Sequence, residues 1–333
     1  HVRKMLSKVN AKKATGYDRL PAKLVSKASD VIAPTVTRLI NCMLDQCSFP
    51  DAMKCAEISP VFKKDDALNK SKYRPVSVLT CISKVFEKVL NEQFSEHFYA
   101  SYAKDLSAYR KKCNTQTVLL KAIDDWKLAL DQGNFVGALL MDLSKAFDVI
   151  PHGLLLAKIK AYGYNNEVAM MFRSYLTNRK QRVKVDDARS EWSLMRMGVP
   201  QGSVLGPTLF NVFLNDLFFC MAGEGDSACL YNYADDNTLS YVSNSMDILM
   251  NNIERLGSMM TAWFSSNGMK ANPEKYQMIT FGNKRNAPVS LTINNARIDP
   301  QDSVKLLGIC IDEKLDFSQQ TSLVCKKASK QVN

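Results

Sequence analysis

The sequence predicts an α+β fold, and three observations point to that class. Of the 333 residues, 46% are hydrophobic and 23% are charged, proportions that are ordinary for a globular protein and exclude a wholly disordered, collagen-like or coiled-coil chain. Segments with apolar residues at helical spacing and short strand-like segments interleave irregularly along the chain. No repeat, low-complexity segment or Gly/Ser/Pro linker divides it, so a single domain is expected.

The first third of the chain is predicted to be mainly helical. Residues 1–27 carry eight Lys or Arg against one acid, Asp18, with apolar residues at helical spacing, and the helical pattern continues over residues 31–47. Residues 56–78 are strand-like around a charged loop. Residues 79–98 follow as an amphipathic helix.

Helices and strands alternate in the middle of the chain. Residues 115–130 predict a helix with Thr115 as its N-cap. Residues 135–142 are short and apolar, as in a buried strand. Residues 151–162 predict a helix with proline at its start and Gly163 just past its end.

The last part of the chain is predicted to contain most of the strands. Residues 181–185 alternate as in a strand, and residues 205–219 form an apolar helix. Residues 230–242 predict two strands around an acidic pair, and residues 246–267 a long helix that ends at Gly268. Further strands are predicted at residues 276–281, 289–293 and 305–311.

The net charge favours a nucleic-acid partner. Lys and Arg number 44 and Asp and Glu number 33, so the formal net charge is +11. A positive excess of this size points to an anionic partner, with nucleic acid as the leading interpretation. Composition alone leaves open the alternative of a soluble basic protein without such a partner.

The cysteines and histidines predict an intracellular protein without a zinc site. The nine cysteines are odd in number and form no C-x-x-C pair, and the three histidines are scattered. We expect the nucleus or cytoplasm rather than secretion, since no signal-peptide pattern opens the chain. The most apolar stretch, residues 204–220, is too short and too polar to cross a bilayer, so no membrane partner is predicted. Because the sequence begins at His1 and ends in a lysine-rich run, it looks like part of a longer protein.

Acidic residues at two places are candidates for metal binding. Asp235 and Asp236 lie between two strand-like segments, at the predicted tip of a β-hairpin. A turn built only for geometry favours Asn-Gly or Asp-Gly, so a divalent cation would explain two adjacent carboxylates; the alternative is a solvated acidic turn. Asp142 ends an apolar strand, where a charge is costly unless it is exposed or binds metal. Converging carboxylates of this kind match two-metal phosphoryl transfer, and Mg²⁺ uses few carboxylates together with substrate phosphates.

Three segments around these acids resemble the motifs of a known enzyme family. Residues 135–163, which include MDLSKAFDVIPH, resemble motif A of the reverse transcriptases of non-LTR retrotransposons, the LINE and jockey-like group. Residues 196–217 (RMGVPQGSVLGPTLFNVFLNDL) resemble motif B, and residues 231–239 (YNYADDNTL) resemble motif C. The order and spacing are those of the family. Further matching segments lie at residues 15–22, 58–78, 108–117, 270–281 and 304–317.

The resemblance implies a right-hand polymerase. Its fingers would comprise about residues 1–130 and 153–197, and its palm, built on an antiparallel sheet, about residues 131–152 and 198–311. About residues 312–333 would begin a thumb.

The resemblance also implies roles for the palm residues. Asp142 and Asp235 would hold two Mg²⁺ ions, for which Mn²⁺ can substitute, with the backbone carbonyl of Leu143 as a further ligand. Asp236 would support them as a weaker ligand. Lys275 matches the motif D lysine, a candidate general acid that protonates the leaving pyrophosphate; a surface lysine is the alternative.

Other matching positions would bind the nucleotide. Phe147 matches the aromatic residue that lies under the sugar and excludes a 2′-hydroxyl, which implies dNTP substrates; a core aromatic is the alternative. Gln201 would contact the template or the nucleotide, and Gly202 would let the backbone approach closely. The alternative for this pair is a helix-entry turn in which Ser203 caps the following helix.

Basic residues of the predicted fingers would contact phosphates. Arg74 and either Lys63 or Lys64 match the positions that hold the triphosphate, and Arg110 is a further candidate; solvated basic loops are the alternative. The run of cations in residues 179–184, with the N-terminal basic segment, would follow the template–primer backbone.

The combined prediction is an RNA-directed DNA polymerase active in retrotransposition. Its partners would be an RNA template, a DNA primer or target and dNTPs, with an endonuclease located upstream on the same polypeptide. Two alternatives remain open at this point: a catalytically inactive nucleic-acid-binding relic of a retroelement, and a reverse transcriptase of the group II intron type.

Overall fold

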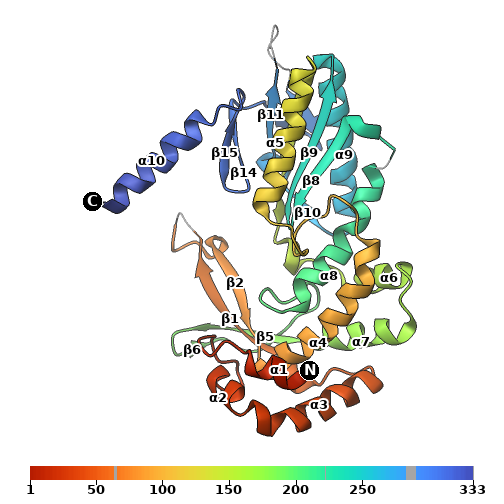
Figure 1. Cartoon of the computed structure of the whole chain (residues 1–333), viewed down its shortest axis with the longest axis vertical. Helices are drawn as coiled ribbons and strands as arrows, with labels where there is room; N and C mark the ends of the chain where they lie inside the picture. The colour runs from red at the N-terminus through yellow and green to blue at the C-terminus, as the bar shows by residue number, and fades with distance from the viewer. Residues whose placement is uncertain (64–65, 222, 283–289, 333) are drawn as a thin grey trace. The chain divides into compact units, whose positions relative to one another are not determined.

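The computed structural model describes residues 1–63, 66–221, 223–282 and 290–332. The chain forms two compact units. The first contains His1–Tyr102 and Phe147–Phe213, and the second contains Ala103–Ala146 and Leu214–Asn333. Helices and mainly antiparallel strands interleave in both (Figure 1), which confirms the predicted α+β class.

The first unit contains a five-stranded sheet of order β2-β1-β5-β6, in which β7 also pairs with β5. β1 pairs antiparallel with β2 and parallel with β5, so strands more than a hundred residues apart in sequence become neighbours. The bounds of these strands are β1 Cys55–Phe62, β2 Tyr73–Val78, β5 Lys180–Val185, β6 Ala188–Arg189 and β7 Ser193–Leu194.

Helices make up most of the rest of this unit. They are α1 Val2–Ser7, α2 Ala22–Lys27, α3 Ser29–Asp45, α4 Cys81–Phe98, α6 His152–Ala161, α7 Asn166–Leu176 and α8 Leu205–Leu214. Their core is aromatic: the Phe49 ring meets the rings of Phe86 and Tyr175 at centroid distances of 5.2 Å each, with interplanar angles of 61° and 85°. Edge-on pairs of this kind are favourable beyond the area they bury.

The second unit is organised around an antiparallel sheet of order β11-β3-β9-β8. β3 (Phe135–Met141) runs between β11 (Gln277–Phe281) and β9 (Asp236–Ser243), and β8 (Ala228–Tyr233) forms the edge. Because β3 is covered on both faces, it is apolar along its whole length, as its sequence predicted.

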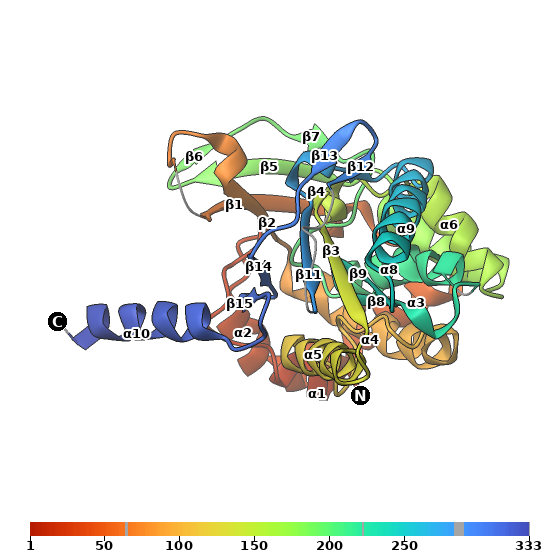
Figure 2. The ribbon, with the colours of Figure 1, turned by 90° about the horizontal axis from the view of Figure 1, so that it is seen from above.

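Two helices cover the opposite faces of this sheet (Figure 2). Trp126 of α5 (Thr115–Asp131) packs in one cluster with Val136 and Ala138 of β3. On the other face, a Cβ on Gly137 would lie 2.3 Å from a side-chain carbon of Ile253 in α9 (Met246–Ser266), so the missing side chain is what lets α9 approach. Both faces of the central strand β3 are thereby covered by helices.

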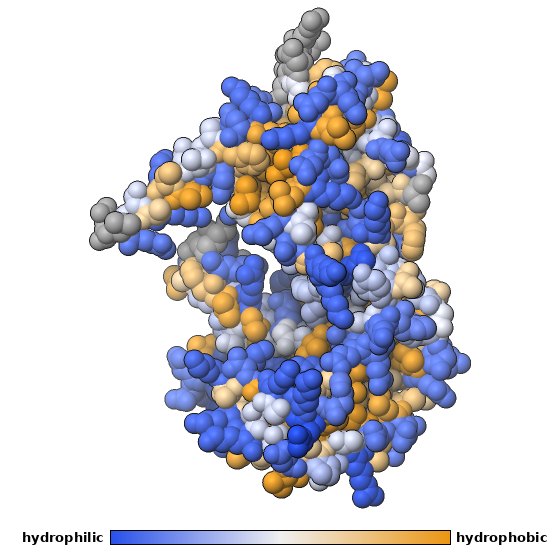
Figure 3. Space-filling view, viewed as in Figure 1, coloured by the Kyte–Doolittle hydropathy of each residue, from blue (hydrophilic) through white to orange (hydrophobic). Residues whose placement is uncertain are grey.

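Short two-stranded ladders and a terminal helix complete the second unit. The ladders pair β4 Leu143–Ser144 with β10 Lys270–Ala271, β12 Leu291–Ile293 with β13 Ala296–Ile298, and β14 Ser303–Leu306 with β15 Ile309–Asp312. The last helix, α10 (Ser318–Val332), carries exposed Leu323 and Val324 beside lysines, so its surface alternates between apolar and hydrophilic (Figure 3).

Most predicted elements are confirmed, with differences at their ends. The N-cap of α5 is Asn114 rather than Thr115. The Asn114 side chain accepts the Thr117 N–H, and the Thr117 side chain accepts the Asn114 N–H. Thr115 cannot form this reciprocal capping box. The predicted helix over residues 205–219 is α-helical only to Leu214 and continues as a 3₁₀ helix over Asn215–Met221. The Asn215 side chain there accepts the Ala103 N–H at 2.7 Å.

Two predicted strands also differ. The strand expected over residues 305–311 is the β14–β15 hairpin, because Leu307 and Gly308 both have positive φ and reverse the chain. The strand expected over residues 289–293 is present as β12 but begins only at Leu291. Residue 289 lies outside the described part of the chain. All nine cysteines are free thiols. In the ranges that the structure describes, no helix combines the length and hydrophobicity needed to span a membrane.

Candidate active site

The β8–β9 turn presents the acidic pair. Tyr233 pairs with Asp236 across the hairpin, so only Ala234 and Asp235 form the turn itself. Ala234 has φ of 57°, a left-handed conformation that costs a residue with a Cβ some strain. The structure thus places Asp235 and Asp236 at the hairpin tip, where both side chains are exposed.

Two buried asparagines stabilise this turn. Asn232 and Asn237 face each other across the hairpin, and the Asn232 Nδ2 donates to the Ala234 carbonyl at 2.8 Å and to the Asn237 Oδ1 at 3.0 Å. The Asn237 Nδ2 donates to the Asp235 carbonyl at 3.1 Å. Because the amides hold both carbonyls of the turn, the strained conformation of Ala234 is kept without glycine.

Asp142 lies directly after β3, and its side chain is 49% exposed. Its backbone carbonyl accepts the Asn272 N–H at 3.4 Å, and the following β4 pairs with β10. The segment from Asn272 turns through the 3₁₀ helix Pro273–Lys275 and brings the Lys275 Nζ to 3.7 Å from the Asp142 Oδ2. This exposed pair adds little stability, but it brings together two residues that the sequence predicted for one site. Leu143 opens β4 opposite Ala271.

The charges of Asp142 and Asp235 act on Asp236. Desolvation by the surrounding protein, followed by the negative charges of Asp235 and Asp142, raises the pKa of Asp236 to about 6. The Asp236 side chain keeps solvent-accessible surface, and the two neighbouring charges add to the effect of desolvation. An accumulation of negative charge of this kind is relieved by a bound cation.

These residues fit Mg²⁺ by the chemistry of their donors. Carboxylate and carbonyl oxygens are the ligands that Mg²⁺ prefers, and it usually binds through one or two carboxylates with waters and substrate phosphates. In the described part of the chain, no three His, Cys, Asp or Glu side chains lie together as a group that could hold a metal ion. Water and substrate phosphates would have to supply most ligands of an ion bound here.

In the first unit, the β1–β2 hairpin carries the predicted triphosphate contacts. The Lys63 N–H, just after β1, donates to the Lys72 carbonyl, and Arg74 in β2 lies opposite Val61. The side chains of Lys63 and Arg74 are both exposed. Lys64, the alternative to Lys63, lies outside the described residues.

Phe147 and the loop before α8 form a second group in the first unit. The Phe147 ring stacks on Phe210 of α8, with centroids 4.4 Å apart and ring planes 14° from parallel. Gln201 is fixed at both ends: its carbonyl accepts the Ser77 N–H at 2.6 Å, and its Nε2 donates to the Asp148 Oδ1 at 2.9 Å. Gly202 has φ of 112°, and a Cβ there would lie 2.8 Å from the Ser77 carbonyl oxygen.

The start of α8 is capped from two directions. The Ser203 Oγ accepts the Gly206 N–H at 2.9 Å, which is the cap expected from the sequence. Glu87 of α4 is fully buried, and its Oε2 accepts the N–H groups of Val204 and Leu205 at 2.6 and 3.2 Å. Burial raises the pKa of Glu87, so its two accepted hydrogen bonds, rather than a negative charge, fix the position at which the Gln201–Gly202 turn enters the helix.

Arg110 supports a loop of the second unit. One of its terminal guanidinium nitrogens, NH1, donates to the carbonyls of Ala103, Lys104 and Leu106, at 2.9, 3.4 and 2.8 Å. These contacts give Arg110 a structural function, and its nucleotide contact stays a prediction.

The basic segment at residues 179–184 is only partly available to a ligand, which corrects the expectation from its sequence. Arg179 is 1% exposed: its guanidinium lies 4.7 Å from the Tyr175 ring centroid and donates to the Tyr175 carbonyl. It is therefore part of the aromatic core. Lys180 of β5 is exposed, whereas Lys184 is half-buried and its Nζ lies 4.0 Å from the Glu57 Oε2 in an ion pair.

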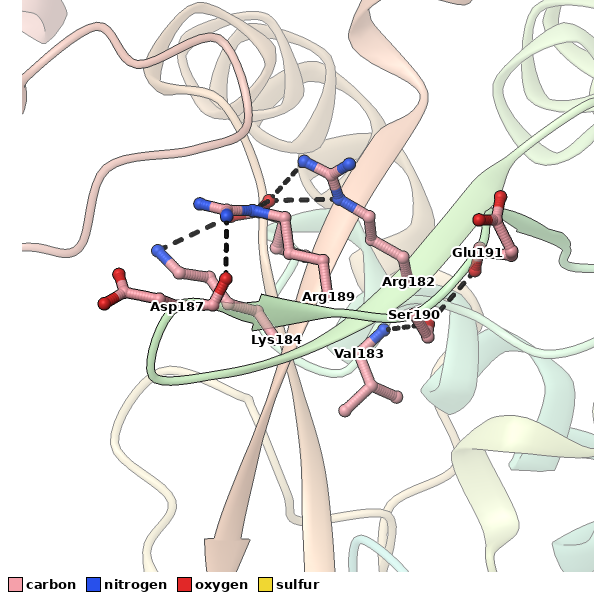
Figure 4. Close-up of polar contacts among 8 residues, drawn as sticks. Arg182, Val183, Lys184, Asp187, Arg189, Ser190 and Glu191 are labelled. Carbon is pink, nitrogen blue, oxygen red and sulfur yellow. Dashed lines mark hydrogen bonds and ion pairs between the residues drawn. The ribbon is translucent and has the colours of Figure 1, made fainter.

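Two further arginines, Arg182 and Arg189, which Figure 4 labels, bind the Glu57 carboxylate. Its Oε1 accepts from Arg182 at 2.6 and 3.1 Å and from the Arg189 Nε at 3.2 Å. Burial raises the pKa of Glu57, but these hydrogen bonds outweigh burial and lower it overall. The Arg182 guanidinium also lies 4.4 Å from the Trp192 ring centroid, which fixes its position further.

Four residues that support these groups, two in each unit, were given no functional role from the sequence. They are Asn232, Asn237, Glu87 and the Gln201 partner Asp148. The asparagine pair left a signal that could have been used, because the two residues are placed symmetrically about the acidic turn and face each other in any hairpin centred there. Glu87 left none, since its partners follow more than a hundred residues later.

The carboxylates at the end of β3 and at the β8–β9 turn, with the loop before α8, are the features of a polymerase of the reverse transcriptase class. Residues 61–311 match the family model described as reverse transcriptase (RNA-dependent DNA polymerase). The chain belongs to this family.

Relatives confirm the resemblance to non-LTR retrotransposon enzymes. The chain is 27% identical over 324 residues to the RNA-directed DNA polymerase from mobile element jockey of Drosophila melanogaster, covering 96% of this chain and 35% of that protein. It is 30% identical over 317 residues to the probable RNA-directed DNA polymerase from transposon BS of the same organism, covering 92% of this chain and 34% of that protein. The chain thus spans about a third of the length of these relatives.

Solved structures show the same fold. The telomerase of Candida tropicalis, in complex with a TWJ fragment of telomeric RNA, aligns with a TM-score of 0.55 at 10% identity, over 93% of this chain and 51% of that one. The telomerase of Candida albicans, in a similar complex, aligns with a TM-score of 0.54 at 14% identity, over 81% and 48%. These likenesses support the right-hand polymerase fold.

Proposed function

We propose that this chain is an RNA-directed DNA polymerase that extends a DNA primer with dNTPs on an RNA template during retrotransposition. The observation that carries the proposal is the match of residues 61–311 to the reverse transcriptase family, in a chain that places Asp142 directly after β3 and Asp235 and Asp236 at the β8–β9 turn. The fingers, the palm and the start of the thumb have the residue boundaries predicted from the sequence.

The carboxylates serve as the metal ligands. Asp142 and Asp235 hold two Mg²⁺ ions, with Mn²⁺ as a substitute, together with the Leu143 carbonyl; Asp236 is a weaker ligand. Bound ions of this kind promote deprotonation of an attacking hydroxyl and offset the charge of a departing pyrophosphate. The Asn232–Asn237 pair supports this arrangement by fixing the carbonyls on both sides of the turn.

Lys275 is the proton donor in the proposed reaction. Its ammonium lies 3.7 Å from the Asp142 carboxylate, which keeps it beside the group that binds metal. A positioned ammonium protonates the oxygen of the leaving pyrophosphate, and general acid catalysis of this type is typically worth about 10²–10⁴-fold in rate.

The remaining residues select and hold the nucleotide. Arg74 and Lys63, with Lys64, contact the triphosphate, for which the guanidinium fork of arginine is well suited; Arg110 is a further contact. Phe147 excludes a 2′-hydroxyl and so selects dNTPs, and its stacking on Phe210 supports this by limiting how far the ring can move. Gln201 and Gly202 contact the nucleotide or the template.

The template–primer is held through its phosphates. The exposed Lys180, the half-buried Lys184 and the N-terminal basic segment provide contacts that do not depend on sequence. The proposal extends to a longer polypeptide with an endonuclease upstream, acting in the nucleus or cytoplasm, because the relatives are about three times as long as the part that matches.

Primer extension tests the proposal. The chain is incubated with oligo(dT) on poly(rA), dTTP and Mg²⁺, and the products are resolved by length. We expect extension by the wild type, none by Asp235→Ala, and wild-type extension by the matched control Asp226→Ala, an exposed acid outside the site.

Two results would contradict the proposal: absence of dNTP incorporation by the wild type, or equal incorporation by Asp235→Ala. Retention of template–primer binding without incorporation would favour the alternative of an inactive nucleic-acid-binding relic.

A further inference from the structure

Asp148 and Gln201 lie on two segments whose backbones are joined. The Gly198 N–H donates to the Ile150 carbonyl at 2.7 Å, and the Val199 N–H donates to the Phe147 carbonyl at 2.8 Å. A Cβ on Gly198 would lie 2.6 Å from the Asp148 carbonyl oxygen, so the two segments touch with no room for a side chain. The side chains that project from them are therefore held at a fixed separation.

The contact between these two side chains determines how the Gln201 amide is oriented. The Gln201 Nε2 and the Asp148 Oδ1 are 2.9 Å apart, and both residues are half-buried. An ionised carboxylate only accepts hydrogen bonds, whereas an amide has one donor end and one acceptor end. Asp148 therefore accepts the NH₂ end and leaves the Oε1 end for a ligand. Within the described residues, no group donates to the Gln201 Oε1.

We infer that Asp148 is a positioning residue, which makes Gln201 present a hydrogen-bond acceptor to the bound nucleotide or template. The inference rests on the proposed function. The ligand group that the Gln201 Oε1 recognises is then a hydrogen-bond donor, such as a sugar hydroxyl or a base amino group. An ionised phosphate does not fit, because its oxygens, like the amide oxygen, only accept hydrogen bonds. Two sources offer such donors, the dNTP and the template–primer, and the KM for dTTP and the Kd for the duplex distinguish them.

Exchanging donor and acceptor between the two positions tests the inference. Gln201→Glu places two carboxylates in contact, and their repulsion displaces the side chain. Adding Asp148→Asn supplies an NH₂ group that donates to the carboxylate introduced at position 201. The second oxygen of that carboxylate then faces the ligand as the wild-type Oε1 does. The double variant thus reverses the internal pair but keeps the acceptor offered to the ligand.

The measurement is kcat and KM for dTTP, with Kd for a fluorescent template–primer, on the wild type, both single variants and the double variant. We expect Q201E to lower kcat/KM or raise Kd at least tenfold and the double variant to regain at least half of that loss on a logarithmic scale. Asp226→Asn is the matched carboxylate-to-amide control. A double variant no better than Q201E overturns the inference, because Gln201 would then act through its NH₂ group.

A second comparison applies if Q201E does not fold. Asp148→Asn keeps an acceptor oxygen for Gln201, whereas Asp148→Ala does not, so the asparagine variant should retain several-fold more activity; equal losses would refute the positioning role. If the wild type extends no primer, the proposed function fails separately, and the same proteins are ranked by their affinities for dTTP and for the duplex. Recovery in the double variant then supports the inference, and its absence overturns it.

Discussion

Phe147 is held by one ring face against Phe210, and the stacking leaves little freedom for the ring to give way. Replacing it with valine should therefore relax sugar selection. We expect the preference of Phe147→Val for dTTP over UTP to fall at least about tenfold, or about 1.4 kcal/mol, in single-nucleotide extension. Phe219→Val, at a ring that is 59% exposed, is the matched control. Unchanged selection in Phe147→Val would refute the sugar-excluding role.

Glu57 makes the first unit sensitive to acid. Its pKa is lower in the folded chain than in the unfolded one, so its contribution to stability is complete above the unfolded pKa of about 4.3 and is lost as the pH falls through the folded value. Glu57→Gln should lower the free energy of unfolding at pH 7 by about 1.5–3 kcal/mol, as expected for hydrogen bonds to a charged group.

Denaturant unfolding at several pH values checks this prediction. The difference between the wild type and Glu57→Gln should shrink as the pH falls below about 4. Glu191 is an exposed residue close to Arg189 in the sequence (Figure 4). Glu191→Gln is the matched control and should behave as the wild type. A difference that is constant with pH would show that the carboxylate charge is not the stabilising group.

At the residue scale, the signals that the sequence offers are local. Asp142 and the Asp235–Asp236 pair stand out because charge interrupts an apolar pattern, and that interruption is visible in a short window. Arg179 looked like its exposed neighbours because Phe49, which encloses it together with Tyr175, lies far away in the sequence. Glu57 and Arg182 are 125 residues apart and meet only because β1 and β5 are neighbouring strands.

At the level of elements, the turn between β7 and α8 depends on a glycine. Gly202 has φ of 112° and faces the Ser77 carbonyl, so Gly202→Ala combines backbone strain with a steric clash. We expect it to lower the free energy of unfolding by about 1–3 kcal/mol and to reduce primer extension.

Gly153 provides the matched control for this substitution. It lies inside α6 in open space, where alanine is a better helix former by about 0.5–1 kcal/mol. Gly153→Ala should therefore leave the protein as stable or more stable in thermal unfolding. Equal effects of the two substitutions would show that the conformation of Gly202 is not required.

The elements themselves were predicted well, because their periodicity and end signals lie within a few residues of each other. Errors occurred where a side chain decides between neighbouring alternatives. Asn114 rather than Thr115 caps α5 because only Asn114 completes the box with Thr117. The α-helix after Leu205 changes to a 3₁₀ helix at Asn215, which bonds to a segment about 110 residues earlier.

For the whole molecule, the +11 net charge overstates the charge available to nucleic acid. Arg179 and Lys158 are buried, with the Lys158 Nζ donating to the Phe213 carbonyl at 2.8 Å, and Glu57 engages Arg182 and Arg189. Cations used in this way stabilise the fold. Counting charges in the sequence predicts the class of partner but not which cations meet it.

The Mg²⁺ dependence of single dTTP addition on an RNA template tests most directly whether the acidic residues form a catalytic metal site. For the wild type we predict saturable activation by Mg²⁺ and complete loss of activity with a chelator. Asp235→Asn should lower the maximal rate by at least about a hundredfold, close to 2.7 kcal/mol, while Asp226→Asn follows the wild-type curve. Addition that is independent of Mg²⁺, or equal curves for Asp235→Asn and the wild type, would contradict the assignment.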